Sequence, residues 1–378
     1  MARIRDIRLI PLEYPMPAIK AYGMSRSLTA VRASCLVELT TEDGVVGIGE
    51  AWGPAKATAG YLEVIRDAFV GRELYDREAI LSDILCRRYH LGWQNQMLAC
   101  VSGINIAIYD AMGKMLGLPV CKLLGGRIRD RIPAYASDGY LSHDPDNQLD
   151  AQLDRIADQG FPAAKFKIGL GPKSDAERVA LARRILGDDM LLLVDTNGNY
   201  TVDIALDSMR RIAPYDVHFY EEPLPPQDFE GYRILTSRAP IPVATGEALY
   251  TIHDFTRLIA PRAIDVAQPD PTLCGGLDQA KAIAILCQAH NVRFSPHVWG
   301  SAVGVAAAVH LLASLPDYPH SDNSPYPRLL EYDVGANPLR DELLTEPLRA
   351  IEGHVPVPDK PGLGIELDPD VVRRYRVG

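Results

Sequence analysis

Three acidic residues recur along the chain in two equal steps of 26 residues: Asp195, Glu221 and Glu247. Each stands at the end of a short apolar segment, in "LLLVDTN", "HFYEEP" and "VATGE". One such step fits a strand followed by a helix, so three successive parallel strands would deliver one carboxylate each to the same face. Carboxylates brought together repel one another unless a cation joins them, and an all-oxygen set suits Mg²⁺. We therefore expect these residues to be the ligands of one Mg²⁺ ion.

Residues able to carry protons flank this acidic set. Lys165 and Lys167 in "FPAAKFKIG" are two residues apart, so in a strand both side chains point to the same side. Ammonium groups crowded in a poorly solvated site lower each other's pKa, which predicts a lysine base. Asp270 in "VAQPD" and His297 in "SPHVWG" end the next two apolar segments, where the aspartate would orient the imidazole as a second base or acid. The metal would then lie between two bases.

Other residues near these motifs lack such a pattern. Glu222 follows Glu221 directly, so we expect its side chain on the opposite face of the strand, in a structural role. The glycines of "GSAVG" fit either phosphate binding at a helix start or tight turns. A structural or surface role is expected for three histidines without a partner pattern: His143, His218 and His320.

The elements that must position these residues alternate regularly. Eight short apolar segments read as strands, over residues 131–137, 163–169, 191–197, 217–223, 241–247, 264–270, 292–298 and 329–333. Segments with helical spacing separate them, as at 175–186, 203–213 and 276–290. This alternation favours a closed parallel barrel. The rival, an open doubly wound sheet, is disfavoured because no GxGxxG motif follows the first strand.

The first third of the chain has a different spacing of apolar residues. Residues 3–50 read as strands with a hairpin turn at "EDG", and residues 58–118 show helical spacing. This predicts an α+β domain over residues 1–128, followed by the barrel domain over residues 129–340. The last segment, residues 341–378, carries proline and glycine turns, and we expect it to pack back on the first domain.

Composition narrows the choice of partners. The net charge of −10 over 378 residues argues against nucleic acid and anionic membrane surfaces, while small anionic substrates stay open. The six cysteines form no CxxC pair, so neither a zinc ribbon nor a disulfide framework is indicated. Because no signal pattern or long apolar run is visible, we expect a cytoplasmic protein.

The ordered set "KFK", "DTN", "EEP", "GE", "QPD" and "PHVWG" resembles the enolase superfamily, mandelate racemase subgroup, over nearly the whole chain. The resemblance implies a modified (β/α)7β barrel covered by an N-terminal α+β capping domain and completed by the C-terminal segment. It implies Lys167 as the base on one face with Lys165 beside it, and His297 with Asp270 as the acid or base on the other. This superfamily is a known case of Lys or His bases working with Mg²⁺ around an enediolate.

The same resemblance implies further site residues. Asn197 in "DTN" matches a position that contacts the substrate carboxylate or the ligand shell. Glu331 in "LLEYD" matches a carboxyl that hydrogen-bonds the far oxygen of that carboxylate, which would require a raised pKa. A capping loop, "KAYGMSRSLTA", and the pocket wall supply the remaining expected substrate contacts: Tyr22, Met24, Arg26 and Trp299. Arg26 would suit the second carboxylate of a diacid.

Two longer stretches indicate the branch of the family. "PHVWGSAVGVAAA" and "LLEYDVGANPLRDELL" are similar to the acid-sugar dehydratases and galactarolactone cycloisomerases. We therefore expect a Mg²⁺-dependent dehydratase that removes the proton α to a carboxylate and eliminates water to give a 2-keto-3-deoxy acid. A lactone cycloisomerase, or a racemase or epimerase, would use the same residues. A binder of sugar acids without turnover is the alternative of another class. The resemblance also implies a homo-oligomer, from dimer to octamer.

Overall fold

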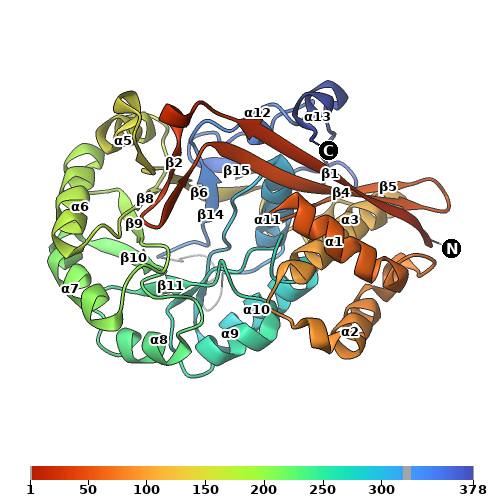
Figure 1. Cartoon of the computed structure of the whole chain (residues 1–378), viewed down its shortest axis with the longest axis horizontal. Coiled ribbons are helices and arrows are strands. Elements are labelled where there is room, and N and C mark those ends of the chain that lie inside the picture. Colours follow the sequence, from red (N-terminus) through yellow and green to blue (C-terminus); the bar gives the residue numbers. More distant parts are fainter. Residues whose placement is uncertain (1, 318–324, 378) are drawn as a thin grey trace.

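A computed structural model describes residues 2–317 and 325–377 of the chain (Figure 1). An N-terminal unit of strands and helices lies against a barrel of parallel strands ringed by helices. His320 lies outside the described residues. None of the helices in the described ranges has the length and apolar character needed to cross a membrane.

The N-terminal unit is built on a three-stranded antiparallel sheet in the order β1 (Ile4–Pro15), β4 (Val31–Thr41), β5 (Val46–Ala51). Its helices are α1 (Ala55–Ile65), α2 (Arg77–Arg87) and α3 (Gln96–Leu116). Helix α3 packs closely on β5 because glycines face each other: a Cβ at Gly49 would lie 2.0 Å from the carbonyl oxygen of Gly103. The α+β character expected from the sequence is thus confirmed.

The barrel consists, within the described residues, of eight strands joined by helices. The strands are β6 (Arg131–Ser137), β8 (Ala163–Lys167), β9 (Leu191–Asp195), β10 (Val217–Glu221), β11 (Val243–Thr245), β12 (Val266–Ala267), β13 (Arg293–Phe294) and β14 (Leu330–Asp333). The helices that follow the first seven are α5 (Leu149–Ala157), α6 (Pro172–Leu186), α7 (Val202–Ile212), α8 (Phe229–Thr236), α9 (Thr251–Ile259), α10 (Gly276–His290) and α11 (Ala302–Ala313). Of these strands, those from β6 to β13 pair in parallel with their neighbours in the chain, and β14 pairs in parallel with β6, which confirms the expected (β/α)7β barrel.

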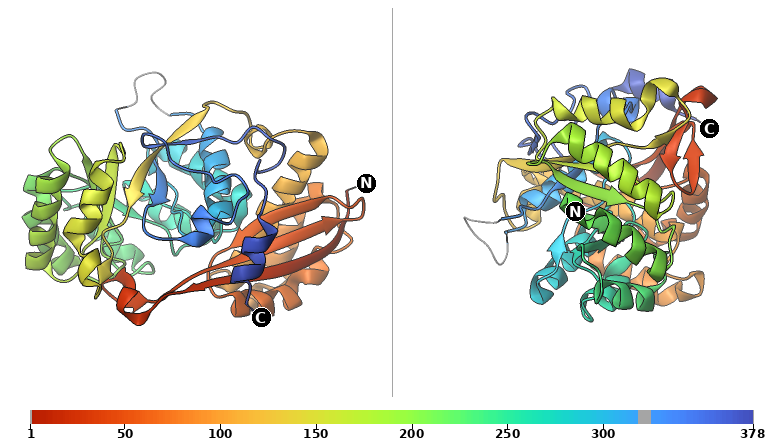
Figure 2. Two further views of the ribbon diagram at one scale, coloured as in Figure 1. Left: turned by 90° about the horizontal axis from the view of Figure 1, so that it is seen from above. Right: turned by 90° about the vertical axis from the view of Figure 1, so that its left-hand side faces the viewer.

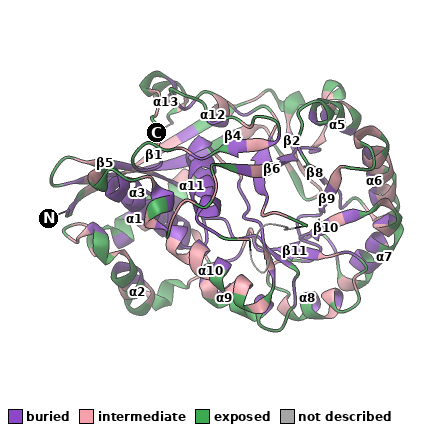
Figure 3. Ribbon diagram, turned by 180° about the vertical axis from the view of Figure 1, so that it is seen from behind, coloured by how far each residue is buried: buried purple, intermediate pink, exposed green. Residues whose placement is uncertain are grey.

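Side chains fill and close this barrel. Tyr135, Phe219 and Val266 belong to a buried cluster inside the strands, so the site rests on a packed layer. The last two strands around the ring are joined by a side chain, since the Ser295 hydroxyl donates to the carbonyl of Leu329 at 2.9 Å. Burial is concentrated in the strands and in the helix faces turned toward them (Figure 3).

The C-terminal segment contacts both units. Strand β15 (His354–Pro356) pairs antiparallel with β6, and α13 (Pro369–Tyr375) lies across β1 (Figure 2). The amide of Leu363 donates to Asp110 on α3 at 2.8 Å. The segment therefore contacts the N-terminal unit and also pairs a strand with β6 of the barrel. The boundary proposed after residue 340 falls within the short helix α12 (Pro338–Asp341).

Candidate active site

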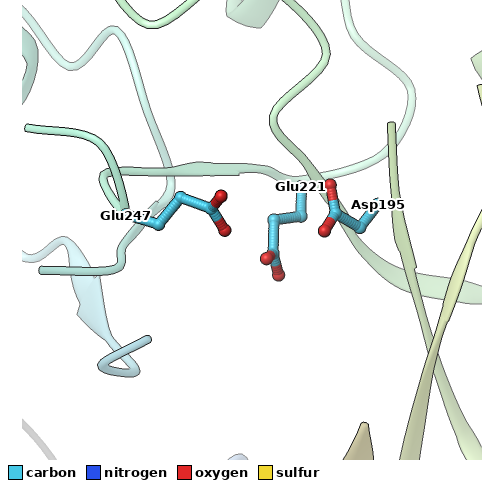
Figure 4. A group of neighbouring side chains, drawn as sticks. All are labelled: Asp195, Glu221 and Glu247. Atoms are coloured by element: carbon cyan, nitrogen blue, oxygen red, sulfur yellow. The ribbon is translucent and has the colours of Figure 1, made fainter. Parts of the chain in front are cut away.

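The three equally spaced carboxylates converge at the C-terminal ends of neighbouring barrel strands (Figure 4). Asp195 ends β9, Glu221 ends β10 and Glu247 follows β11, and one oxygen of each lies within 4.8 Å of the others. Asp195 and Glu221 are fully buried. Burial raises the pKa of Glu221 to about 8, with Lys165 opposing the shift and Asp195 adding to it. A buried, mutually repelling set of carboxylate oxygens fits a hard divalent cation.

Two amide side chains complete this carboxylate cluster. The backbone amide of Asn197 donates to Asp195 Oδ1 at 2.7 Å, and its side-chain amide lies 3.5 Å from Glu247 Oε1. Gln268 donates to Glu221 Oε2 at 2.7 Å. The carbonyl oxygens of both side chains, Asn197 Oδ1 and Gln268 Oε1, are buried and have no hydrogen-bond partner among the described residues. Orphaned oxygens beside three carboxylates are consistent with a cation or a substrate donor. Gln268 belongs to the "QPD" motif, in which only Asp270 was expected to have a role.

Both lysines of "KFK" point into the cluster from β8. Lys165 Nζ lies 2.5 Å from Glu221 Oε1 and 2.8 Å from Glu331 Oε1, and Lys167 Nζ lies 2.5 Å from Asp195 Oδ2. The expectation of lowered lysine pKa values is wrong for this arrangement. Burial lowers the pKa of each ammonium group, but the paired carboxylates outweigh it and raise both values. A divalent cation on the same oxygens would compete with these ion pairs.

His297 and Asp270 form the predicted pair on the other side of the cluster. His297 Nδ1 lies 2.7 Å from Asp270 Oδ2, and Nε2 lies 3.5 Å from Glu247 Oε2. The other oxygen of Asp270 accepts from the amide and the hydroxyl of Thr272, each at 2.7 Å. Burial lowers the pKa of His297, but Glu247, Glu331 and Asp270 together raise it to about 10. The ring is therefore oriented through Nδ1, with Nε2 facing the carboxylates.

Glu331 lies on β14, where it is ion-paired to Lys165. It accepts from the Ser137 hydroxyl at 2.8 Å and from the amide of Val298 at 3.0 Å. Burial raises its pKa, but Lys165 and His297 outweigh burial and lower it to about 2. The expectation of a raised pKa for Glu331 is therefore corrected: the ion pair with Lys165 lowers it.

Glu222 lies just beyond β10, which ends at Glu221, so the alternation expected for a strand does not apply to it. Its backbone has a φ of 42°, which lies in the left-handed region and breaks the two-residue alternation of a strand. The side chain is buried, and Oε1 has no hydrogen-bond partner within the described ranges. Burial and the charges of Glu247 and Asp195 raise its pKa well above the usual range. Glu222 thus stands close to the carboxylate cluster.

The capping loop folds as a hairpin over the barrel mouth. Its strands β2 (Tyr22–Met24) and β3 (Ser27–Thr29) pair with each other, and β2 also pairs with β7 (Leu141–Ser142), from the loop after β6. Met24 is half-buried. Arg26 is exposed, and its guanidinium donates to the carbonyl of Asn197 at 3.4 Å. The hairpin is thus joined to the loop that carries one of the expected substrate contacts.

An aromatic wall lies between the hairpin and the lysines. The guanidinium of Arg32 lies 4.1 Å from the ring of Tyr22 and is ion-paired to Asp333 at 3.0 Å. Trp299 Nε1 donates to the hydroxyl of Tyr140 at 3.1 Å, and Lys167 Nζ lies 5.9 Å from the Tyr140 ring. The structure brings Tyr22 and Trp299 to the same guanidinium, because that of Arg32 also lies 5.4 Å from the ring of Trp299. It adds Arg32, Tyr140 and Asp333, which were missed because they are distant in sequence.

Comparison with known proteins agrees with this geometry. The family model described as "Mandelate racemase / muconate lactonizing enzyme, N-terminal domain" matches residues 13–125, and "Enolase C-terminal domain-like" matches residues 148–371. The chain is 36% identical over 348 residues to D-galactarolactone cycloisomerase of Agrobacterium fabrum, covering 92% of each chain. It is 29% identical over 389 residues to arabinonate dehydratase of Saccharolobus solfataricus, covering 99% of each.

A solved structure extends the likeness to the fold. The 3,6-anhydro-D-galactonate cycloisomerase of Zobellia galactanivorans matches with a TM-score of 0.88 and 32% identity, covering 100% of both chains. These relatives are dehydratases and cycloisomerases, that is, lyases and isomerases. The chain therefore belongs to the mandelate racemase and muconate lactonizing enzyme family of the enolase superfamily.

Proposed function

We propose that this protein removes the proton α to the carboxylate of an acid sugar, or of its lactone, and expels the oxygen at the β carbon. One observation carries the proposal: two proton carriers reach the carboxylate cluster from different sides. Lys167 Nζ is 2.5 Å from Asp195, and His297 Nε2 is 3.5 Å from Glu247. A protein that only binds a sugar acid has no use for a lysine opposite an aspartate–histidine pair.

In this reaction Lys167 and His297 would transfer protons, and Lys165 would stabilise negative charge. One carrier, Lys167 or His297, would first have to lose the proton that the neighbouring carboxylates stabilise. It would then take the α-proton, and the electron pair of the C–H bond would move into the substrate carboxylate. The bond between the β carbon and oxygen then breaks, and the departing oxygen takes its electron pair and a proton from the other carrier. Lys165, held by Glu331 at 2.8 Å, supplies positive charge beside the carboxylate as negative charge builds up. The resulting enol becomes a 2-keto-3-deoxy acid.

Asp195, Glu221 and Glu247 would hold the metal ion, and Mg²⁺ suits their oxygens best. When bound, Mg²⁺ would neutralise part of the negative charge on the substrate carboxylate. Asn197, Tyr22, Met24, Arg26 and Trp299 are proposed as substrate contacts. Asn197 Oδ1 and the Tyr22 hydroxyl support this assignment, because both are buried without a partner among the described residues.

Dehydration and lactone opening differ only in the oxygen that departs. In dehydration a hydroxyl leaves as water, whereas in cycloisomerisation the ring oxygen leaves and remains attached to the product. Dehydration is the first candidate for this site. Cycloisomerisation is the second, favoured by the 36% identity to galactarolactone cycloisomerase. Function as a cytoplasmic homo-oligomer, from dimer to octamer, is part of the proposal, and light scattering after size-exclusion chromatography would measure the assembly.

Proton NMR in D₂O tests the proposed reaction. The protein is incubated with Mg²⁺ and with hexarates, hexonates, pentonates and aldarolactones in turn. Loss of an α-proton signal with a keto-deoxy product from an open acid supports dehydration, and the same loss from a lactone supports cycloisomerisation. Exchange without elimination indicates a racemase or epimerase. If no substrate exchanges while a sugar acid raises the melting temperature, the protein is a binder and the proposal is wrong.

A further inference from the structure

Glu50 is a buried carboxylate of the N-terminal unit to which the proposed reaction gives no role. It lies near the end of β5 with 2% of its surface exposed. Oε1 accepts from the hydroxyl of Ser34 at 2.8 Å and from the amide of Ser301 at 2.9 Å. Oε2 accepts from the hydroxyl of Ser301 at 2.6 Å and from the amide of Gly304 at 2.7 Å. Three of these four donors belong to the N-terminus of α11, where a negative charge is stabilised.

Two glycines are fitted around this carboxylate. A Cβ at Gly300 would lie 2.5 Å from Glu50 Oε1, and a Cβ at Gly304 would lie 3.0 Å from Oε2. Larger residues at either position would push the helix away from the N-terminal unit. The glycines of "GSAVG", which fit a phosphate site or tight turns in the sequence, thus make room for a side chain of the same chain.

The segment held by Glu50 begins with His297. Between the imidazole and α11 the backbone is fixed at two points: the amide of Val298 donates to Glu331 at 3.0 Å, and the amide of Ser301 donates to Glu50. A shift at the start of α11 is therefore passed to His297 over four residues of chain. Displacement of a catalytic group by about 1 Å can cost a factor of about 100 in rate.

The same end of β5 also contacts the segment that orients Asp270, the partner of His297. The amide of Trp52 donates to the carbonyl of Thr272 at 3.0 Å, and Thr272 binds Asp270 through its own amide and hydroxyl. Residues 50–52 thus contact the segments of both members of the Asp270–His297 pair. Lys167 contacts Asp195 and Tyr140, neither of which belongs to residues 50–52.

We propose that Glu50 is a positioning residue through which the N-terminal unit fixes the His297 segment for proton transfer. This inference rests on the proposed function, because it assigns His297 a proton in the reaction. Glu50 acts through the helix start and touches neither the carboxylate cluster nor Lys167. Its loss is therefore expected to lower turnover while leaving metal binding unchanged.

The test compares two carboxylates that join the same two units. Glu50→Gln keeps the shape but replaces an acceptor oxygen with an NH₂ group that faces N–H donors. Asp278→Asn on α10 is the control, since Asp278 accepts from Asn105 at 2.7 Å and from Tyr109 at 2.6 Å, both on α3. We expect kcat to fall about 10- to 100-fold in Glu50→Gln, with KM changed less than about 3-fold, as when an outer residue that orients a metal ligand is lost. Asp278→Asn should keep kcat near that of the wild type.

Amide hydrogen exchange provides a readout that does not depend on turnover. In Glu50→Gln the peptide covering residues 297–304 should exchange about 10-fold faster, since opening of this segment becomes easier. Asp278→Asn should leave that peptide unchanged. If Glu50→Gln does not fold, Ser301→Ala replaces it, because this variant removes a single hydroxyl from the same contact.

The outcomes separate this inference from the proposed function. Wild-type kcat in Glu50→Gln, or an equal loss in Asp278→Asn, would overturn the positioning role. If the wild-type enzyme transforms no substrate, the proposed function fails, and exchange alone then decides whether Glu50 holds the segment. Unchanged exchange at residues 297–304 in Glu50→Gln would overturn the inference whatever the activity.

Discussion

The imidazole of His297 bridges two carboxylates: Nδ1 lies 2.7 Å from Asp270, and Nε2 lies 3.5 Å from Glu247. A carboxylate at Nδ1 keeps a proton on that nitrogen and leaves Nε2 for the proposed proton exchange with the substrate. The pair thus places one proton carrier at the edge of the carboxylate cluster, across from the lysines of β8.

Asp270→Asn tests this orientation. Oδ1 can still accept from Thr272, but the new NH₂ group would donate to Nδ1 and force the proton onto Nε2. We expect kcat to fall at least about 100-fold, the usual contribution of a general acid or base. Steady-state kinetics and a melting curve measure the two effects. A kcat within a few-fold of the wild type would remove Asp270 from the mechanism.

Lys167→Ala and His297→Asn should each abolish product formation. Each removes one of the two proton carriers, and neither residue is a proposed metal ligand, so the fold and Mg²⁺ binding should persist. NMR in D₂O then measures exchange of the α-proton separately from elimination. The variant that still exchanges lacks the group of the second step. Loss of Mg²⁺ binding in either variant would contradict the assigned roles.

Mg²⁺ should stabilise the fold through the carboxylate cluster. Binding to the folded state alone adds about 2.7 kcal/mol to the free energy of unfolding at a concentration 100 times Kd. Thermal melting with and without Mg²⁺ measures this gain. Glu247→Gln should reduce it, whereas Glu230→Gln, at an exposed site on α8, should not. An equal gain in Glu247→Gln would show that the ion binds elsewhere.

The sequence predicts this site well where spacing determines position. The 26-residue steps bring Asp195, Glu221 and Glu247 together because each step is one strand and one helix of a regular barrel. The pattern does not apply at Glu222, because the strand ends at Glu221 and the backbone of Glu222 is left-handed. It fails for the charge state of Lys165, which depends on distances to carboxylates from other strands.

Contacts between distant parts of the chain are beyond a single sequence. Arg32 and Asp333 form an ion pair across 301 positions, and nothing in the sequence links the two. Glu50 and Ser301 are likewise joined across the boundary between the two units. These residues join the N-terminal unit to the barrel, so their contacts can be identified only once the fold is known.

Tyr22→Phe tests the proposed substrate contact of the capping hairpin. The hydroxyl of Tyr22 is buried and lacks a hydrogen-bond partner in the described part of the chain, so its removal should not lower the melting temperature. If the hydroxyl binds substrate, KM should rise about 2- to 10-fold, the value of one hydrogen bond. Kinetics on the substrate found by NMR measure this change. An unchanged KM would assign Tyr22 to packing against Arg32 only.

His310 should make the fold sensitive to acid independently of the active site. It is fully buried in α11, with Nδ1 accepting from the amide of Cys121 at 3.3 Å and Nε2 donating to the carbonyl of Leu363 at 3.0 Å. Burial lowers its pKa to about 4. In the unfolded chain the ring titrates near its usual pKa of about 6.5, so between these values the unfolded state binds the proton. Stability is therefore retained above pH 6.5 and lost as the pH falls toward 4, by up to about 3 kcal/mol.

Melting curves between pH 7.5 and 4.5 measure this dependence. In His310→Gln the melting temperature should be lower at pH 7.5, because the buried contacts are lost, but it should fall less steeply with acid. The control is His143→Gln, at an exposed position, which should keep the wild-type slope. If His310→Gln retained that slope as well, the acid sensitivity would arise from the paired carboxylates, whose protonation also favours unfolding at low pH.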